Sequence, residues 1–542
     1  MTDLEENETV TGQSGDPGPA VEPGWRPEAA EIVFRRRLAS ALGGPEAVAK
    51  HHSRGRLTVR ERIAAVADPA SFQEVGALTG QGHYEDGKLV SVTPAPYVMG
   101  LATIEGRPVA IGGEDFTVRG GSSWKVSRRK GGQGGFAEDL AFEYRMPLVC
   151  LADGAGGSVT SMLRRGHSVF PGVDGFERSV ELMGIVPVVC AVLGTAAGGP
   201  AGRAILAHWS VMVDKTSHIF AAGPPVVERA LGQDISREDL GGAYIAADLA
   251  GTIHNVATSE EECLAMIRRY LSYMPRHVWE LPPIVDLGDP PNRAEEELID
   301  IVPKNRRRPY DMRRLIELIV DHQSTFEIQP TYGASVITCL ARLNGRVVGV
   351  IANDPMVFGG AVDSPAARKQ AHFVELCDTF HIPIVFLVDV PGFMVGQDAE
   401  VDGTLREGMR SLYVTMQATV PILTVVIRKC YGMAGMAAVD KNGLRFKIAW
   451  PSAEWGSLPI EGGVAAAHRS ELAQAEDPAQ RELEIEAEYR AVSSPFLTAE
   501  AFGVEDIIDP RETRAYLCRF LDVAAERLAT DLGPKARFGV RP

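Results

Sequence analysis

Two short segments of the chain, separated by more than two hundred residues, follow the same pattern. The first reads RMPLVCLADGAGG (residues 145–157) and the second reads HIPIVFLVDVPGF (residues 381–393). In each, a proline precedes an apolar run that is typical of a buried parallel strand, and the run ends in an aspartate followed by glycine. A chain that contains the same strand and loop twice is constrained to fold as two similar units.

The duplication extends to flanking segments, and it preserves their order. IEGRPVAIGGEDF (104–116) matches LNGRVVGVIANDP (343–355), and MGIVPVVCAVLGTAAGG (183–199) matches QATVPILTVVIRKCYGM (417–433). Pro187 precedes Gly198 by 11 residues, and Pro421 precedes Gly432 by the same 11 residues. Chance agreement of single prolines and glycines does not keep order over such a distance, so the sequence predicts two duplicated domains.

The coarse pattern predicts an α/β layered fold. Short apolar strands alternate with helical segments such as 134–145 and 365–380. Residues 25–95 are predicted to form a helical lead-in, and residues 468–492 a charged helix. The segment 277–310 has the proline and charge content of an interdomain linker, which places the domain boundary near residue 300.

Composition excludes several classes of protein. The net charge of −16 argues against a nucleic-acid partner, because phosphate contacts need a positive surface field. The seven cysteines form no C-x-x-C pair and are predicted to be buried thiols of a cytoplasmic protein. No apolar run approaches the roughly 20 residues that span a bilayer, so no membrane segment is predicted. Residues 1–25 are acidic and rich in glycine and proline, which predicts a disordered tail.

Each half contains two glycine-rich loops that follow buried strands. They are ADGAGGSV (152–159) and GTAAGGPAG (194–202) in the first half, and VDVPGF (388–393) and CYGMAGMA (430–437) in the second. Glycine lets successive backbone N–H groups point at one position, and two such donors stabilise an oxygen that gains negative charge. One loop of this kind is usually only a turn, but four at matching positions favour two anion-stabilising pockets.

Conventional catalytic side chains are not evident. Asp153 and Asp389 precede the loops and are predicted to cap turns rather than act as bases. His208 and His254 lie in apolar surroundings and are predicted to be hydrogen-bonded structural histidines. The sequence contains no G-x-S-x-G elbow, no H-E-x-x-H zinc motif, no phosphate-binding loop and no dinucleotide fingerprint. No metal site is predicted.

At these residues the chain resembles the carboxyltransferase (β) subunits of biotin-dependent acyl-CoA carboxylases, such as propionyl-CoA and methylcrotonyl-CoA carboxylase, in the crotonase superfamily. The similar stretches are RLTVRERI with SFQEVG (56–76), SREDLGGA with GTIHNVA (236–257), GGAVDSPAARKQAHFVELCDTFHIPIVFLVDVPGF (359–393), and RKCYGMAG with AWPSAEWG (428–456). The resemblance implies two tandem crotonase-like (ββα-superhelix) domains. Residues 26–300 would form the acyl-CoA side and residues 301–542 the biotin side.

The resemblance also implies a mechanism and its partners. A biotin carboxylase and biotin carboxyl carrier (α) subunit would bring carboxybiotin, since this chain contains no biotinylation site. Carboxybiotin would release CO2, the biotin enolate would remove the α-proton of the coenzyme A thioester, and the thioester enolate would attack CO2. The family's cleft forms between the first domain of one subunit and the second domain of another, which implies a homohexamer.

Site residues follow from the resemblance as well. In the first domain, Gly156 and Gly157 would donate N–H groups to the thioester oxygen, with Gly198 and Gly199 lining that pocket. In the second domain, the N–H groups of four residues would bind biotin: Gly392, Phe393, Met433 and Ala434.

Three positions depart from the family pattern. Asp153 is followed by GAGGS rather than S-G-G-A-R, and Pro200, which has no N–H, replaces an alanine. Met436 stands where propionyl-type enzymes carry aspartate, which suggests a larger or branched acyl group. The basic clusters SRRK (127–130) and LRR (163–165) are candidates for contacts with CoA phosphates.

Other functions remain compatible with the sequence. A biotin-dependent acyl-CoA decarboxylase subunit would run the same transfer in reverse. A non-catalytic paralogue that serves as an assembly scaffold would explain the departures in the first half. A crotonase-like hydratase is disfavoured, because neither loop of the first half offers the carboxylate pair that its chemistry needs.

Overall fold

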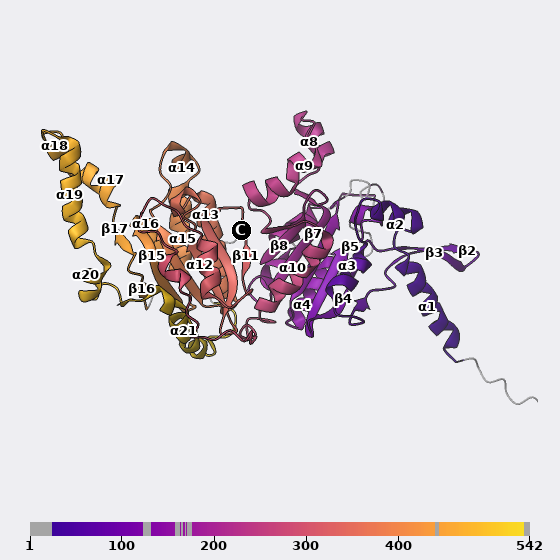
Figure 1. Cartoon of the computed structure of the whole chain (residues 1–542). Helices are drawn as coiled ribbons and strands as arrows, with labels where there is room; N and C mark the ends of the chain where they lie inside the picture. The colour runs from indigo at the N-terminus through magenta and orange to yellow at the C-terminus, as the bar shows by residue number, and fades with distance from the viewer. Residues whose placement is uncertain are drawn as a thin grey trace, which may run out of the picture.

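The chain forms two similar halves that lie side by side (Figure 1). The computed structural model describes residues 24–122, 132–157, 163, 166–168, 170, 176–439 and 444–535. Each half contains one mixed sheet with helices packed on it, which confirms the predicted α/β class. The predicted tail, residues 1–25, lies outside the described residues except for Gly24 and Trp25.

The two sheets have the same strand order. The first runs β1 (Gln73–Val75), β4 (Tyr97–Ile104), β5 (Arg107–Glu114), β6 (Leu148–Gly154), β7 (Val188–Ala197), β8 (Trp209–Val213), β10 (Asn255–Ala257), with β9 (His218–Phe220) paired to β7. The second runs β11 (Phe326–Ile328), β12 (Val336–Leu343), β13 (Arg346–Asn353), β14 (Ile384–Val390), β15 (Ile422–Tyr431), β16 (Phe446–Ala449), β18 (Asp506–Ile507), with β17 (Glu454–Gly456) paired to β15. In each sheet antiparallel pairs come first and parallel pairs follow, so the predicted duplication is confirmed.

Helices cover both sheets. Those of the first half are α1 (Arg26–Ser40), α2 (Pro45–His52), α3 (Val59–Val66), α4 (Gly132–Glu143), α6 (Glu177–Leu182), α7 (Gly199–Ile205), α8 (Pro224–Leu231), α9 (Arg237–Gly241), η3 (Tyr244–Leu249) and α10 (Glu260–Tyr273). Those of the second half are α11 (Glu297–Asp300), α12 (Met312–Ile319), α13 (Ser364–Thr379), α14 (Gln397–Val401), α15 (Thr404–Gln417), α16 (Gly432–Val439), α17 (Ile460–Ala467), α18 (Arg469–Leu472), α19 (Pro478–Val492), α20 (Pro495–Glu500) and α21 (Thr513–Leu528). Strands β6, β7 and β14 are buried along their whole length, as expected for parallel strands covered on both faces.

The two halves also share individual hydrogen bonds at one hairpin turn. The β4–β5 hairpin turns at Glu105–Gly106 and the β12–β13 hairpin at Asn344–Gly345, and all four residues have positive φ. In the first turn both backbone N–H groups donate to the carboxylate of Asp68, at 2.8 and 2.9 Å. In the second they donate to Asp321, at 2.7 and 2.9 Å. The same side chain therefore fixes the same hairpin in each half.

The halves contact each other through buried polar groups and a shared apolar core. The side-chain amide of Asn255 donates to the carbonyl of Glu327 at 3.0 Å. The Nε2 atoms of His254 and His372 lie 2.9 Å apart. One cluster of buried apolar side chains contains residues of both sheets, so the two halves pack as one body.

The helical lead-in predicted for residues 25–95 is wrong beyond α3. After β1 the chain forms a two-stranded ribbon of β2 (Gly80–Glu85) and β3 (Lys88–Pro94), which projects from the body at the end that carries α1 (Figure 1). Asp86 and Gly87 connect its strands with φ of 47° and 75°. An Asp-Gly pair with these dihedrals makes a tight hairpin turn, which overrides helix formation.

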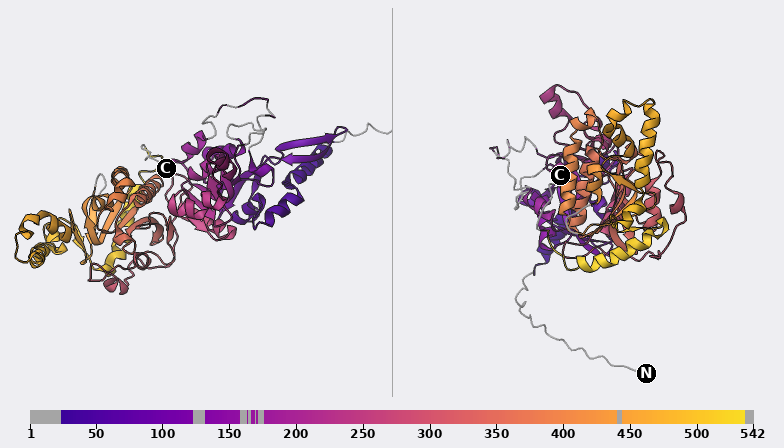
Figure 2. Two further views of the ribbon diagram at one scale, coloured as in Figure 1. Left: turned by 90° about the horizontal axis from the view of Figure 1, so that it is seen from above. Right: turned by 90° about the vertical axis from the view of Figure 1, so that its left-hand side faces the viewer.

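The single helix predicted for residues 468–492 is also wrong. It is divided into α18 and α19, and Asp477 caps α19 by accepting the N–H groups of Ala479 and Gln480. Pro478 occupies the first position of α19, where its missing N–H costs no helical bond. With α17 and α20, these helices form an arm at the end of the molecule opposite the β2–β3 ribbon (Figure 2).

All seven cysteines are free, and all except Cys430 are buried, as predicted. Within the described residues, no helix combines the length and the apolar character needed to cross a bilayer. The domain boundary near residue 300 stays a prediction, although the segment between α10 and α12 is largely irregular, with only the short α11 in it.

Candidate active site

The first pair of glycine loops, residues 155–157 and 198–199, follows the neighbouring parallel strands β6 and β7. Gly156 and Gly198 both have positive φ, of 75° and 60°. A Cβ atom on Gly156 would lie 2.5 Å from the carbonyl oxygen of Ala197 and 3.5 Å from Cα of Gly198. Only glycine allows this approach, so the fold brings the two predicted loops together.

Among the described residues, no atom lies within 4 Å of a Cβ built on Gly157, so this residue faces open space in that part of the chain. Gly199 is the first residue of α7, and Pro200 lies in its first turn. Backbone N–H groups of the first turn have no partner within the helix, so Pro200 removes no helical hydrogen bond. The structure therefore accommodates this departure from the family pattern.

The second pair consists of the loop 391–394, which follows β14, and residues 432–434, which follow β15 and form the first turn of α16. Gly392 has φ of 145°, and a Cβ on it would meet no atom within 4 Å. Its carbonyl accepts the N–H of Val362 at 3.1 Å, which fixes the first loop. In the first turn of α16, Met433 is 42% exposed and Ala434 is buried. This pair lies on the second sheet, whereas the first pair lies on the first.

The ring of Phe393 packs against Gly408, a residue without a side chain. A Cβ on Gly408, in α15, would lie 2.4 Å from the ring of Phe393. The ring therefore rests directly on the helix backbone. Because Phe393 is one of the predicted donors, Gly408 influences the position of its N–H group.

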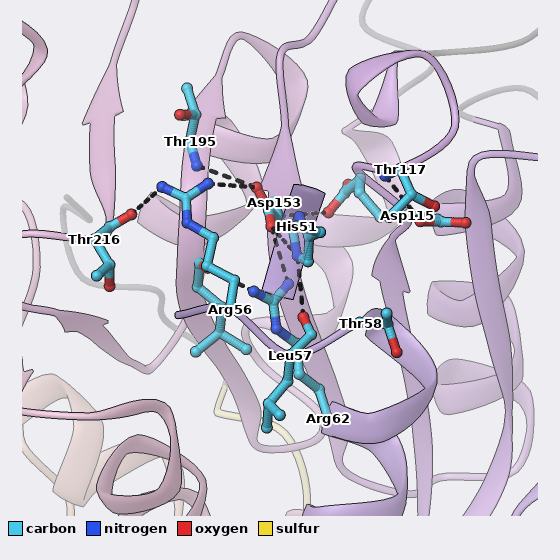
Figure 3. Close-up of polar contacts among 12 residues, drawn as sticks. His51, Arg56, Leu57, Thr58, Arg62, Asp115, Thr117, Asp153, Thr195 and Thr216 are labelled. Atoms are coloured by element: carbon cyan, nitrogen blue, oxygen red, sulfur yellow. Dashed lines mark hydrogen bonds and ion pairs between the residues drawn. The ribbon is translucent and has the colours of Figure 1, made fainter. Parts of the chain in front are cut away.

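Asp153 and Asp389 are fully buried at the ends of β6 and β14. Asp153 accepts the N–H of Thr195 at 3.2 Å and receives the guanidinium of Arg62 at 3.0 Å (Figure 3). Asp389 accepts the N–H of Lys429 at 3.1 Å. The prediction that each carboxylate caps its own turn is therefore wrong in detail, because each one binds the backbone of the neighbouring strand.

Cations surround Asp153 within the first half. Besides Arg62, Arg56 lies 3.9 Å and His51 3.8 Å from its carboxylate oxygens. Burial lowers the pKa of the His51 imidazole, with the charge of Asp153 opposing that shift. The two guanidinium groups are thus the charges that compensate this carboxylate.

Glu114 ends β5 directly beside the first loop pair, and sequence reasoning missed it. Its Oε2 accepts the N–H of Asp153 at 3.3 Å, and a Cβ on Gly154 would lie 2.9 Å from its side chain. Burial raises its pKa from 4.5 to about 7, a shift that the charge of Arg203 partly offsets. The signal was an acidic residue at the end of an otherwise apolar strand.

The substitution Glu114→Gln is expected to change how stability depends on pH. Because the pKa of Glu114 is higher in the folded protein, its ionisation destabilises the fold as pH rises from about 4.5 to about 7, by about 3 kcal/mol in total. Glutamine keeps an oxygen for the N–H of Asp153 but does not ionise. Its gain in Tm over the wild type should therefore be absent at pH 4.5 and largest at pH 8, as measured by calorimetry.

The control for this experiment is Glu85→Gln, which alters an exposed carboxylate on β2. Its difference in Tm from the wild type should stay near zero from pH 4.5 to 8. A Glu114→Gln gain that is independent of pH would contradict the role given to burial.

The two histidines singled out in the sequence are hydrogen-bonded within the fold, as predicted. His208 accepts the N–H of Val188 through Nδ1 at 3.0 Å, and its Nε2 contacts the carbonyl of Met183 at 2.8 Å. Burial holds the pKa of His254 well below its usual value. Neither ring lies in a glycine loop.

The structure places Met436, but it does not describe the basic residues proposed to contact CoA phosphates. Met436 lies on α16, is 47% exposed, and follows Met433 by one turn on the same helix. The basic cluster 127–130 lies outside the described residues, as do Arg164 and Arg165 of the second cluster.

Comparison with known proteins identifies the family of the chain. The carboxyl transferase domain family matches residues 50–538. The propionyl-CoA carboxylase carboxyltransferase subunit of Haloferax mediterranei is 36% identical over 89% of this chain and 93% of its own length. The chain belongs to the carboxyl transferase family.

Two further relatives inform its chemistry. The methylmalonyl-CoA decarboxylase subunit alpha of Veillonella parvula is 34% identical over 91% of this chain and 96% of its own length. A solved structure of the transcarboxylase 12S hexamer, with methylmalonyl-CoA bound, superposes with a TM-score of 0.83 at 34% identity over 97% of this chain and 100% of its own. The crotonase-like fold expected for both halves is confirmed, and the chain is an acyl-CoA carboxylase carboxyltransferase.

Proposed function

We propose that this chain transfers a carboxyl group from biotin, carried by a partner protein, to the α-carbon of an acyl-CoA thioester. The observation that carries the proposal is the repeated pair of glycine loops at the ends of two neighbouring strands in each half. Open space lies in front of Gly157 in one half and Gly392 in the other. Each half can therefore present backbone N–H groups to an oxygen of a ligand.

In the first half, residues 26–300, the loops would bind the thioester. Loss of the α-proton places negative charge on the thioester oxygen, and the N–H groups of Gly156 and Gly157 would stabilise that charge, with Gly198 and Gly199 lining the pocket. The nearest carboxylates are otherwise engaged, because Arg62 binds Asp153 and Glu114 accepts the N–H of Asp153. Neither is assigned the role of base.

In the second half, residues 301–542, the loops fit a biotin ureido oxygen. The N–H groups of Gly392, Phe393, Met433 and Ala434 would hold it, and within the described part of the chain a Cβ on Gly392 would meet no atom within 4 Å. Bound biotin would supply the carboxyl group and the base that removes the α-proton. The chain's part is to orient the two ligands and to stabilise charge on each.

Assembly as a homohexamer with a biotin carboxylase and carrier subunit forms part of the proposal. The transcarboxylase 12S relative is described as a hexamer. Five apolar side chains are exposed on residues 394–396, α14 and α15, where a neighbouring subunit would cover them: Val395, Val401, Leu405, Met409 and Tyr413. We also propose that the complex acts in the cytoplasm, since a reducing compartment keeps seven free cysteines as thiols.

The reverse reaction is the second candidate. The decarboxylase subunit of Veillonella parvula is 34% identical to this chain, close to the 36% of the carboxylase subunit, so the same loops are compatible with removal of a carboxyl group. Direction depends on whether the partner couples biotin to ATP or to a membrane pump.

The test is to purify the chain with a biotin carboxylase and biotin-carrier partner and to measure ATP-dependent fixation of labelled bicarbonate across a panel of acyl-CoA thioesters. Fixation with at least one thioester supports the carboxylase. Decarboxylation of a carboxyacyl-CoA without any fixation would favour the reverse reaction. Binding of CoA without turnover in either direction would favour a scaffold.

The acyl preference provides a further prediction. An apolar side chain at Met436 favours contact with an apolar acyl chain, so the wild type should prefer longer or branched thioesters. Met436→Asp should lower kcat/KM for a six-carbon thioester relative to propionyl-CoA by about 10-fold or more, because a carboxylate would be desolvated against the chain. Met436→Leu should leave the ranking unchanged. If propionyl-CoA is the best substrate of the wild type and of Met436→Asp alike, the residue does not set specificity.

A further inference from the structure

The two halves share an irregularity in their central strand pair. In the first sheet Ala152 pairs with Val192 and Gly154 pairs with Ala196, so one residue of β6 faces three of β7. In the second sheet Val388 pairs with Val426 and Val390 with Cys430, which again sets one residue against three. A bulge of this kind redirects the end of a strand, and the repetition indicates that both loop pairs need it.

A buried carboxylate occupies the single position opposite each bulge. Asp153 accepts the N–H of Thr195, the last bulged residue of β7, and Asp389 accepts the N–H of Lys429, the last bulged residue of β15. Both aspartates are 0% exposed. An N–H group inside a bulge has no partner in the strand ladder, so the carboxylate provides the bond that the irregular backbone lacks.

The spacing from these bonds to the loops is the same in all four strands. Asp153 precedes Gly156 by three residues, and Thr195 precedes Gly198 by three. Asp389 precedes Gly392 by three, and Lys429 precedes Gly432 by three. Each hydrogen bond therefore links equivalent points on the two loops of one pair, just before each loop turns toward its ligand.

Neighbouring residues fix the position of each carboxylate and compensate its charge. A Cβ on Gly194 would lie 2.0 Å from Oδ1 of Asp153, so this glycine makes room for the side chain. At the aligned position in the second half stands Arg428, whose guanidinium lies 3.0 Å from Asp389. In the first half the cation comes from α3 instead, as Arg62. Different residues thus compensate the same charge in the two halves.

We infer that Asp153 and Asp389 are positioning residues, each of which sets the separation of the two amide-donor loops of its half. The inference rests on the proposed function, because it assumes that the loops stabilise charge on the thioester and on biotin. Two donors act together on one oxygen only when both lie at hydrogen-bond distance from it, and a misplacement of about 1 Å is costly in rate. The carboxylates touch no ligand in this scheme.

The experiment compares two coenzyme A analogues on the full chain in complex with its biotin-carrying partner. One analogue carries a nitronate in place of the thioester enolate, and the other is a thioether that lacks the oxygen. The ratio of their affinities, measured by calorimetry, reports stabilisation of the oxyanion separately from binding of CoA. Asp153→Asn should lower the affinity for the nitronate by about 10-fold or more while changing that for the thioether less than about two-fold.

Two further variants separate positioning from general stability. Gly194→Ala keeps the charge of Asp153 but displaces its carboxylate, and should lower the same ratio even if Asp153→Asn does not fold. Asp68→Asn removes a carboxylate that also binds backbone N–H groups, at the β4–β5 turn, and should leave the ratio unchanged.

The second half supplies a reciprocal test. Asp389→Asn should leave the analogue ratio at its wild-type value and, with an ATP-using biotin carboxylase partner, slow the bicarbonate-dependent hydrolysis of ATP measured without acyl-CoA. Equal ratios for the wild type and for both Asp153→Asn and Gly194→Ala would overturn the positioning role while leaving the proposed function standing. A wild type that binds both analogues equally would overturn the oxyanion pocket itself, and the positioning role with it.

Discussion

Replacement of Gly157 by proline is expected to lower kcat for acyl-CoA carboxylation by about 10²–10³, because it deletes one N–H donor to the thioester oxygen. The fold should tolerate the ring, since no atom of the described residues lies within 4 Å of a Cβ at this position and the φ of Gly157 is not positive. The preceding residue, Gly156, is the residue type least restricted by a following proline. KM for the acyl-CoA should change little, because the lost bond strengthens mainly in the transition state.

The matched control is Gly157→Ala, which adds a methyl group in the same open space but keeps the N–H. It should retain activity within a few-fold of the wild type in the labelled-bicarbonate assay. Equal losses in the alanine and proline variants would point to a steric effect. Full activity of Gly157→Pro would remove this amide from the mechanism.

The repeated architecture was predictable because it depends on residue types with few alternatives. Proline before a buried strand and glycine after it are required by backbone geometry, so duplicated copies kept them at equal spacing. The structure extends that agreement to the hairpin turns at Gly106 and Gly345 and to the aspartates that hold them. Local geometry was therefore the most reliable information in the sequence.

The two wrong helix predictions, for residues 25–95 and 468–492, overlooked signals that are present in the sequence. The ribbon of β2 and β3 follows from Asp86–Gly87 between alternating residues, and the break between α18 and α19 follows from Asp477–Pro478. In both places a long helical interpretation ignored a local residue pair that stops a helix or turns a strand. Both segments lie at opposite ends of the molecule (Figure 2).

The buried charges beside the loops were not predictable from sequence spacing. Arg62 lies 91 residues before its partner Asp153. The contact between the ring of Phe393 and Gly408 of α15 is likewise not visible in the sequence. In the second half the corresponding cation, Arg428, comes from the adjacent strand. Such pairs depend on which elements the fold places side by side, and the same chemical need is met from different positions in the sequence.

Arg62→Met is expected to destabilise the first half by about 3–5 kcal/mol, the usual effect of removing one partner from a buried ionic group. The Arg62 guanidinium is 1% exposed and lies 2.7 Å from Glu260 and 3.0 Å from Asp153. It also donates to the carbonyl of Leu193, which lies in the bulge of β7. Methionine fills similar space but leaves two buried carboxylates without their shared cation. The midpoint of urea unfolding of the full chain should shift to a lower urea concentration.

Arg60→Met is the matched control, because it lies on the same helix and removes an equally direct ion pair. The Arg60 guanidinium binds both carboxylate oxygens of Glu74 at 2.8 Å, but both side chains are about one-quarter exposed. Water can solvate Glu74 once its partner is gone, so this change should cost less than about 1 kcal/mol. If both variants lowered the transition equally, burial would not be what makes Arg62 important. A loss of stability confined to Arg62→Met would show that Asp153 and Glu260 depend on Arg62 for their charge compensation. Water cannot take the place of the arginine at this buried site, whereas it can at Glu74.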